Sequence, residues 1–262
     1  MKPVCSRSRA VGLAAATLVI AAASAHAGEI KVMTSGAFTA AYLELLPRFE
    51  QATKNKLVTT ATSTGVGADS IASRLHRGEE TDVVIVPDSV FDELMKDGRI
   101  AAGSRVDLAR SEIGIAVKTG APKPDISSVD GLKRALLKAK SIAYSASVSG
   151  QYFSKELVQR LGIADQVLPK AHRIDRERVG AVVARGEAEI GIQQVSELLP
   201  VPGIDFVGML PAEVQRSMIV SAGIPVTAKN PDAGRAFIEF LSSPGAAAVV
   251  KKTGLEPLAK VH

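Results

Sequence analysis

Three short turns rich in serine, threonine and glycine are the parts of this chain best suited to hold a ligand. They are Ser35-Gly36, Ser63-Thr64-Gly65 and Ser149-Gly150-Gln151, and each stands just before a predicted helix. Hydroxyls and free backbone N–H groups at a helix N-terminus favour an anion by about 0.3–1 kcal/mol per site. A single Ser or Thr before a helix is most often only its cap, whereas three such turns in both predicted lobes indicate a binding site. The turns predict a site for a small anion.

Few side chains near these turns could carry a proton. Tyr152 follows the third turn, Asp88 ends a predicted strand, and His76 lies in the helix after the second turn. Each has a simpler role, as a packing aromatic, a helix cap and a surface histidine. Arg74 could clamp a carboxylate and Gln194 could bond to it, although a solvated helix face is the simpler role for the arginine. The sequence therefore leaves the proton carrier open.

Strands alternating with helices would position these residues. Apolar segments at 30–33, 57–61 and 82–86 predict strands that are each followed by a helix. Strands that are apolar throughout are covered on both faces, as in parallel sheets. Passages at about Val117 and Met218 predict lobe 1 from 28–117 and 218–262, and lobe 2 from 118–217. We therefore expect an α/β protein with two doubly wound sheets joined by two hinge crossings, and a ligand beyond the carboxyl ends of the strands.

The first 27 residues predict export. Lys2, Arg7 and Arg9 precede an apolar run that is too short for comfortable membrane spanning, and Ala25-His26-Ala27 suits signal peptidase. We expect residues 1–27 to be removed as a signal peptide and the mature protein to be periplasmic. Without the three basic residues the net charge falls from +5 to +2. This near balance gives no reason to expect nucleic acid or a membrane as partner.

The sequence lacks the motifs of several other kinds of functional site. It has no His, Asp and Glu spacing typical of a metal site, no Gly-Lys-Ser/Thr phosphate loop and no Gly-x-Ser-x-Gly elbow. Gly65-Val66-Gly67 lacks the third glycine of a dinucleotide loop. Neither a metal nor a cofactor is expected.

Three segments of the first lobe resemble the periplasmic molybdate-binding proteins of ABC importers, a branch of the type II solute-binding fold. They are Ile30-Lys31-Val32-Met33-Thr34-Ser35-Gly36, Thr62-Ser63-Thr64-Gly65 and Thr81-Asp82-Val83-Val84-Ile85-Val86-Pro87-Asp88. In that family, serine hydroxyls and backbone amides hold the oxyanion without a metal. The resemblance implies contacts from Ser35 and from Ser63 or Thr64.

The second lobe departs from that family at its two ligand-binding turns. Ser147-Val148-Ser149-Gly150-Gln151 replaces a Pro-Ala-Gly turn, and Gln193-Gln194 stands where a tyrosine is common. The segment 186–198 is more similar to a divergent exported branch that includes the periplasmic aconitate isomerases. This resemblance implies an isomerase that interconverts trans- and cis-aconitate by an allylic proton shift. The alternative is a non-catalytic receptor that delivers molybdate or another small anion to an ABC permease.

Overall fold

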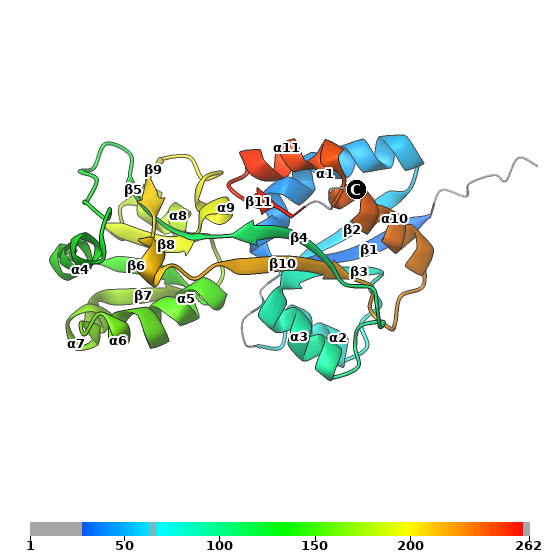
Figure 1. Ribbon diagram of the computed structural model, residues 1–262, viewed down its shortest axis with the longest axis horizontal. Coiled ribbons are helices and arrows are strands. Elements are labelled where there is room, and N and C mark those ends of the chain that lie inside the picture. Colours follow the sequence, from blue (N-terminus) through cyan, green and yellow to red (C-terminus); the bar gives the residue numbers. More distant parts are fainter. Residues whose placement is uncertain (1–27, 63, 65–66, 259–262) are drawn as a thin grey trace, which may run out of the picture.

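The protein has two α/β lobes side by side, each built on its own sheet (Figure 1). The arrangement is that of a computed structural model, which describes residues 28–62, 64 and 67–258. The predicted signal segment 1–27 and two predicted site residues, Ser63 and Gly65, lie outside the described residues. None of the described helices is long and apolar enough to cross a membrane.

A mixed sheet of six strands forms the first lobe. The strands are β1 (Glu29–Thr34), β2 (Lys56–Ala61), β3 (Val83–Pro87), β4 (Val106–Ser111), β10 (Met218–Gly223) and β11 (Glu256–Pro257). Their order is β11-β4-β10-β3-β1-β2. The strands β1, β2 and β3 are parallel, whereas β10 runs antiparallel to β3 and β4, and β11 antiparallel to β4.

Five helices cover the two faces of this sheet. They are α1 (Gly36–Thr53), α2 (Ile71–His76), α3 (Asp88–Lys96), α10 (Pro231–Leu241) and α11 (Pro244–Lys252). Alternate residues of β3 point to opposite faces: Val83 and Ile85 pack in the cluster with α1, α10 and α11, and Val84 and Val86 in the cluster with α2 and α3. Burial on both sides explains why this strand is apolar throughout.

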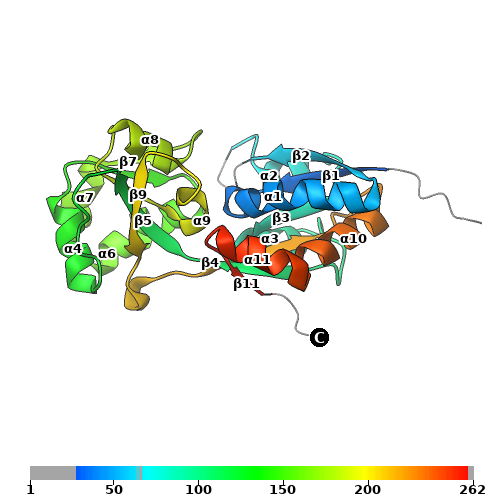
Figure 2. The same cartoon turned by 90° about the horizontal axis from the view of Figure 1, so that it is seen from above.

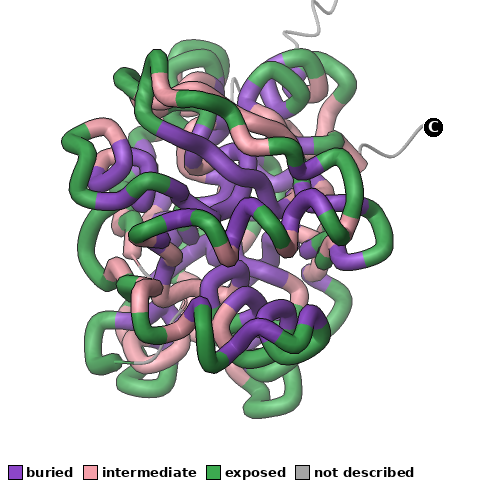
Figure 3. Tube along the Cα trace, turned by 90° about the vertical axis from the view of Figure 1, so that its left-hand side faces the viewer, coloured by how far each residue is buried: buried purple, intermediate pink, exposed green. Residues whose placement is uncertain are grey.

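The second lobe has a five-stranded sheet in the order β7-β6-β8-β5-β9. Its strands are β5 (Ile113–Lys118), β6 (Ile142–Ser145), β7 (Ala171–Ile174), β8 (Ile190–Gln194) and β9 (Ile204–Met209). The strand β6 is parallel to β7 and β8, and β5 is antiparallel to β8 and β9. Seen from the end of this lobe, the buried segments lie in the middle and the exposed turns around them (Figure 3).

Short helices surround the second sheet. They are α4 (Val129–Lys138), α5 (Val148–Tyr152), α6 (Val158–Arg160), α7 (Ala164–Val167), α8 (Val179–Arg185) and α9 (Val195–Leu198). A π-helical turn, η1 (Phe153–Leu157), joins α5 to α6, and single 3₁₀ turns lie at η2 (Leu168–Lys170) and η3 (Ala212–Val214). Their apolar side chains form a core separate from that of the first lobe.

The chain crosses between the lobes twice. The first crossing is at Glu112, the single residue between β4 and β5, and not at about Val117 as predicted. The whole of β5 pairs with β8 and β9, so 113–117 belong to the second sheet. The return runs from β9 to β10, and β10 begins at Met218.

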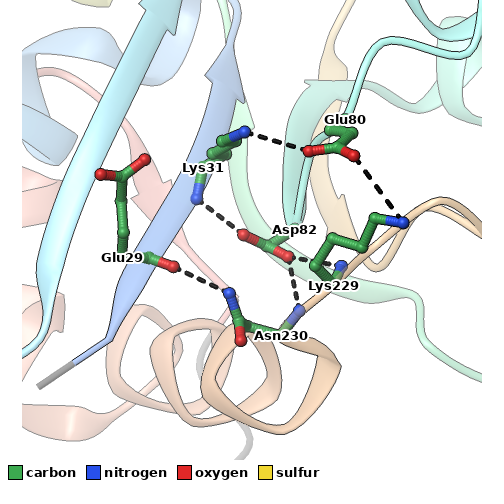
Figure 4. Close-up of polar contacts among 6 residues, drawn as sticks. All are labelled: Glu29, Lys31, Glu80, Asp82, Lys229 and Asn230. Atoms are coloured by element: carbon green, nitrogen blue, oxygen red, sulfur yellow. Dashed lines mark hydrogen bonds and ion pairs between the residues drawn. The ribbon is translucent and has the colours of Figure 1, made fainter. Parts of the chain in front are cut away.

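A buried carboxylate at the amino-terminal end of β3 fastens this strand to β1 and to the start of α10 (Figure 4). Asp82 is 2% exposed and stands just before β3. One of its oxygens accepts from the N–H of Lys31 at 2.8 Å, and the other accepts from the N–H groups of Lys229 and Asn230 at 2.9 and 2.7 Å. The Asn230 side chain donates to the carbonyl of Glu29 at 2.9 Å. These bonds fix the start of α10 against β1 and β3.

Replacing Asp82 by asparagine is expected to lower the free energy of unfolding by about 1–2 kcal/mol, because one accepting oxygen becomes a donor. Asp232 supplies a matched control, since its side chain is 97% exposed in the first turn of α10. Its replacement by asparagine is expected to cost less than about 0.5 kcal/mol. Urea unfolding of the two variants measures the difference, and equal losses would contradict the fastening role of Asp82.

Candidate functional site

A cavity of about 380 Å³ lies between the lobes, at the carboxyl ends of β1, β3, β6 and β8. Hydroxyl, amide and charged side chains of both lobes line it. Among these lining residues are Ser35, Gly36, Thr39 and Thr64 from the first lobe and Ser145, Ser147, Ser149, Arg176, Arg178, Gln193, Gln194 and Glu197 from the second. This is the place where open α/β sheets bind ligands.

The turn from β1 into α1 forms the first-lobe wall. Ser35 is 3% exposed, and its N–H donates to the carbonyl of Ile85 at 2.9 Å, which holds the turn against β3. Among the described residues its hydroxyl has no hydrogen-bond partner, and it does not cap α1. A buried hydroxyl left unpaired costs free energy that a ligand acceptor would recover. The hydroxyl of Ser35 is therefore available to a ligand in the cavity.

Three serine hydroxyls face the cavity from the second lobe, where β6 leads into α5. The Oγ atom of Ser145 lies 2.7 Å from that of Ser147 and 3.1 Å from that of Ser149. None of the three hydroxyls caps α5, whose N-cap is Ser147. We call Ser145, Ser147 and Ser149 the serine cluster. Because each hydroxyl can rotate to donate or accept, the cluster can donate hydrogen bonds to the oxygen atoms of an anion.

Glu197 brings a carboxyl group into the cavity wall. It belongs to α9, and its Oε2 accepts from Gln193 Nε2 at 2.7 Å. Burial raises the pKa of Glu197 to about 7, although the Arg178 charge and the Gln193 hydrogen bond both act to lower it. A carboxyl group with this pKa is poised near neutral pH between the two forms that a general acid or base needs.

The lobes touch where α9 meets the beginning of α1 (Figure 2). Ser196 Oγ donates to the carbonyl of Ala37 at 2.7 Å, across the boundary between the lobes. A Cβ atom on Gly36 would lie 2.5 Å from Oε2 of Glu197. The absence of a side chain at Gly36 thus leaves room for the carboxyl group, a role that the sequence did not suggest.

Two arginines supply positive charge on the second-lobe side. In the described part of the chain, Arg176 and Arg178 form no ion pair, whereas neighbouring Asp175 and Glu177 each pair at 2.8 Å with an arginine that does not line the cavity. The charges of Asp175 and Glu177 are therefore balanced by arginines outside the cavity. Arg176 and Arg178 keep their charge for a ligand.

Gln193 and Gln194, at the end of β8, have different partners. Gln194 Oε1 accepts from Ser111 Oγ at 2.7 Å, and its amide lies 3.8 Å from the sulfur of Met218. Both partners belong to the crossing strands, so Gln194 lines the cavity and also joins β8 to the hinge. Gln193 Oε1 accepts from the N–H of Val179 at 3.0 Å, which directs its Nε2 toward the Glu197 carboxyl group.

Only some of the other residues predicted in the turns line the cavity. Thr64 does, but Gly150 and Gln151 do not. A Cβ atom on Gly150 would lie 1.6 Å from the carbonyl oxygen of Ser145, so this glycine permits the close packing of α5 on β6. The side chain of Gln151 is exposed.

Tyr152 and Asp88 line a different cavity of about 230 Å³ beside the hinge. The hydroxyl of Tyr152 donates to the carbonyl of Val214 at 2.6 Å, and Arg216 stacks 5.4 Å from its ring centre. Asp88 accepts from the N–H of Ser89 at 2.9 Å. Neither residue lines the 380 Å³ cavity, although Ser149 and Gln194 line both cavities.

His76 and Arg74 lie on α2, outside the cavity. The Nε2 atom of His76 is 3.0 Å from a carboxylate oxygen of Asp97. Arg74 donates to Glu79 at 2.7 Å. Both predicted residues thus have local partners in the first lobe.

Sequence reasoning did not name Glu197, Arg176 or Ser145 as site residues, and it placed Ser147 and Gln193 only within polar turns of the second lobe. A usable signal was present for Glu197, which stands three residues after the buried strand end at Gln194. For Ser145 and Ser147 the signal was their membership of the same polar turn as Ser149. Recognising the burial of Glu197 required the position of α1.

Comparison with known proteins extends over nearly the whole described chain. A family model for bacterial extracellular solute-binding proteins matches residues 30–256. A protein named aconitate isomerase, from Pseudomonas sp, is 44% identical over 230 residues, which cover 87% of this chain and 88% of that protein. The molybdate-binding protein ModA of Azotobacter vinelandii is 27% identical over 240 residues, covering 89% and 92%.

Solved structures share the architecture. The periplasmic molybdate-binding protein of Azotobacter vinelandii superposes with a TM-score of 0.66 at 18% identity and covers 86% of this chain and 98% of that one. Peb3 of Campylobacter jejuni superposes with a TM-score of 0.64 at 15% identity, covering 87% and 99%. These likenesses confirm the predicted two-lobed α/β fold.

Proposed function

The chain belongs to the bacterial extracellular solute-binding proteins, and from this premise we propose that it is an aconitate isomerase that converts trans-aconitate to cis-aconitate. The family implies a periplasmic location. Export by a cleaved signal peptide at 1–27 is part of the proposal. The observation that carries it is the carboxyl group of Glu197 among the anion donors of the cavity, with a pKa of about 7. The 44% identity to a protein named aconitate isomerase supports it.

The donor set suits a tricarboxylate. Ser35 offers a hydroxyl from the first lobe, the serine cluster offers hydroxyls from the second, and Arg176 and Arg178 offer charge. Three carboxylates spread over one small molecule need donors on more than one wall, and bonds to charged groups contribute more than neutral ones. Closure of such lobes around a ligand excludes water and strengthens these interactions.

The reaction is an allylic proton shift. A base removes a proton from the methylene carbon, and an acid returns a proton to the carbon at the far end of the double bond. The charge that develops between the two steps spreads into the adjoining carboxylates. Fixed donors and arginines around those carboxylates would stabilise it more than they stabilise the substrate, which is the source of catalysis.

Turnover tests the proposal directly. The protein is incubated with trans-aconitate, and cis-aconitate is measured by chromatography or proton magnetic resonance. We expect conversion without added metal or cofactor. Failure of the folded protein to form any cis-aconitate would overturn the proposed function.

A second candidate function is a receptor that delivers molybdate or another small anion to an ABC permease. The likeness to molybdate-binding proteins favours it. In a receptor, an ionised Glu197 would repel an oxyanion at close range. A melting temperature raised by molybdate and unchanged by trans-aconitate would establish the receptor instead.

Replacing Ser35 by alanine is expected to weaken trans-aconitate binding about tenfold, because one ligand bond of about 1.4 kcal/mol is lost. The fold should tolerate the change, since the hydroxyl has no partner among the described residues. Ser243, the N-cap of α11, is the control because it also stands at the start of a helix but does not line the cavity; its hydroxyl donates to the carbonyl of Phe240 at 2.7 Å. Titration calorimetry compares the two alanine variants. Equal affinities would contradict a contact at Ser35.

A further inference from the structure

Glu197 differs from the other acidic side chains of the cavity. Asp175 and Glu177 lie at the exposed rim, and each is held by an arginine. Glu197 is largely enclosed and forms no ion pair within the described residues. A partly buried carboxyl group without an ion pair is costly as a structural element. Its surroundings therefore need a functional explanation.

The hydrogen bonds of Glu197 hold one oxygen and leave the other free. Gln193 is fixed by the N–H of Val179, and its amide donates to Oε2 of Glu197 at 2.7 Å. In the described structure no donor reaches Oε1. The carboxyl group is thus oriented by one of its oxygens while the other can accept a proton from a ligand.

The charged groups around Glu197 allow both protonation states near neutral pH. Arg178, at the start of α8, is the cation that acts on it, and Arg176 lies on the same wall. The beginning of α1, packed against it from the other lobe, lines the cavity with Ser35, Gly36, Ala37 and Thr39, none of which is charged. Burial holds the pKa at about 7, where loss and gain of a proton are both accessible.

We propose that Glu197 is the catalytic residue that removes the methylene proton from trans-aconitate, an inference that rests on the proposed isomerase function. The C–H bond breaks, and the proton goes to Oε1 of Glu197. The electron pair enters the allyl system and its carboxylates. The Glu197 carboxyl group then gives a proton to the carbon at the other end, and a new double bond forms between the central carbon and the former methylene carbon. Protons and electrons balance without a co-reactant.

Gln193 and Gly36 are positioning residues in this arrangement. Gln193 orients the carboxyl group, and Gly36 leaves the space that the carboxyl group occupies. A methyl group at Gly36 would meet Oε2 at 2.5 Å and push the side chain aside. Glycine-to-alanine substitution there is expected to lower kcat by at least about tenfold while KM changes less than about threefold.

Glu197→Gln is the central test, because glutamine keeps the shape and can still accept the Gln193 bond. We expect kcat to fall by about a thousandfold, in the range for loss of a general base, and trans-aconitate affinity to stay within about threefold. In the native protein, kcat/KM should rise with pH through an apparent pKa near 7. Glu239→Gln, an exposed position on α10, is the matched control and should retain native activity.

The outcomes separate this proposal from the proposed function. A folded Glu197→Gln protein with more than about a tenth of native kcat would overturn the role of Glu197 and leave the isomerase function standing. Inactivity of the native protein would overturn both. If Glu197→Gln does not fold, Glu197→Asp decides: a kcat lowered at least about tenfold at near-native KM supports the role, and an unchanged kcat overturns it.

Discussion

Replacing Glu197 by glutamine is expected to change the free energy of unfolding in a pH-dependent way. The substitution should be more stabilising near pH 8 than near pH 4, by at most about 3 kcal/mol. The carboxyl group has a pKa of about 7 in the folded state, against an ordinary value of 4.5. Between these two values the folded chain keeps a proton that the unfolded chain has lost. The free energy of unfolding of the native protein therefore falls as pH rises through this window, and glutamine removes that fall.

Urea unfolding at a series of pH values gives the difference between the native protein and the Glu197→Gln variant. Glu239→Gln controls for removing a carboxyl group at an exposed site. A difference that does not change between pH 4 and pH 8 would contradict the enclosure of the Glu197 carboxyl group. Because this measurement needs no substrate, it tests the site independently of any turnover.

Replacing Gly150 by alanine is expected to lower the free energy of unfolding by about 3 kcal/mol or more, through overpacking against backbone. The added Cβ would lie 1.6 Å from the carbonyl oxygen of Ser145 and 2.7 Å from its carbonyl carbon. Neither atom can turn away as a side chain can, so α5 must move off β6. That displacement should also disperse the serine cluster and weaken trans-aconitate binding.

Gly208, in β9, is a matched control for Gly150. A Cβ atom there would meet only the side chain of Ile126, at 3.5 Å, which is ordinary packing distance. Alanine at Gly208 should cost less than about 1 kcal/mol. Chemical unfolding and calorimetric titration of both variants check the expectation, and equal stabilities would show that α5 can shift freely.

The order of elements could be predicted where the apolar pattern was strong. The strand at 82–86 was recognisable because both of its faces are buried. The strands β4 and β9 were missed, since Val106–Ser111 carries an aspartate and an arginine and Ile204–Met209 is only partly buried. Without β4, the strand β5 was assigned to the wrong sheet and the crossing was placed five residues too late.

The candidate site could be predicted only in its local part. The turns at Ser35 and Ser149 were found because a polar turn between a strand and a helix can be read from neighbouring residues, and the structure places both on the cavity wall. The enclosure of Glu197 could not be found in this way. Its burial depends on Gly36, which lies far away in the sequence and in the other lobe. Tertiary packing of this kind leaves no periodic pattern.

At the contact between α9 and α1, one lobe supplies Glu197 and the other lobe supplies the residues that enclose it. Glu197 and Gln193 belong to one lobe, whereas Gly36 and the Ala37 carbonyl that receives Ser196 belong to the other. We expect separation of the lobes to hydrate Glu197, return its pKa toward the ordinary value and make it a weaker base. The open molecule would thus not catalyse the proton transfer, and each closure of the lobes would raise the pKa of the Glu197 carboxyl group again.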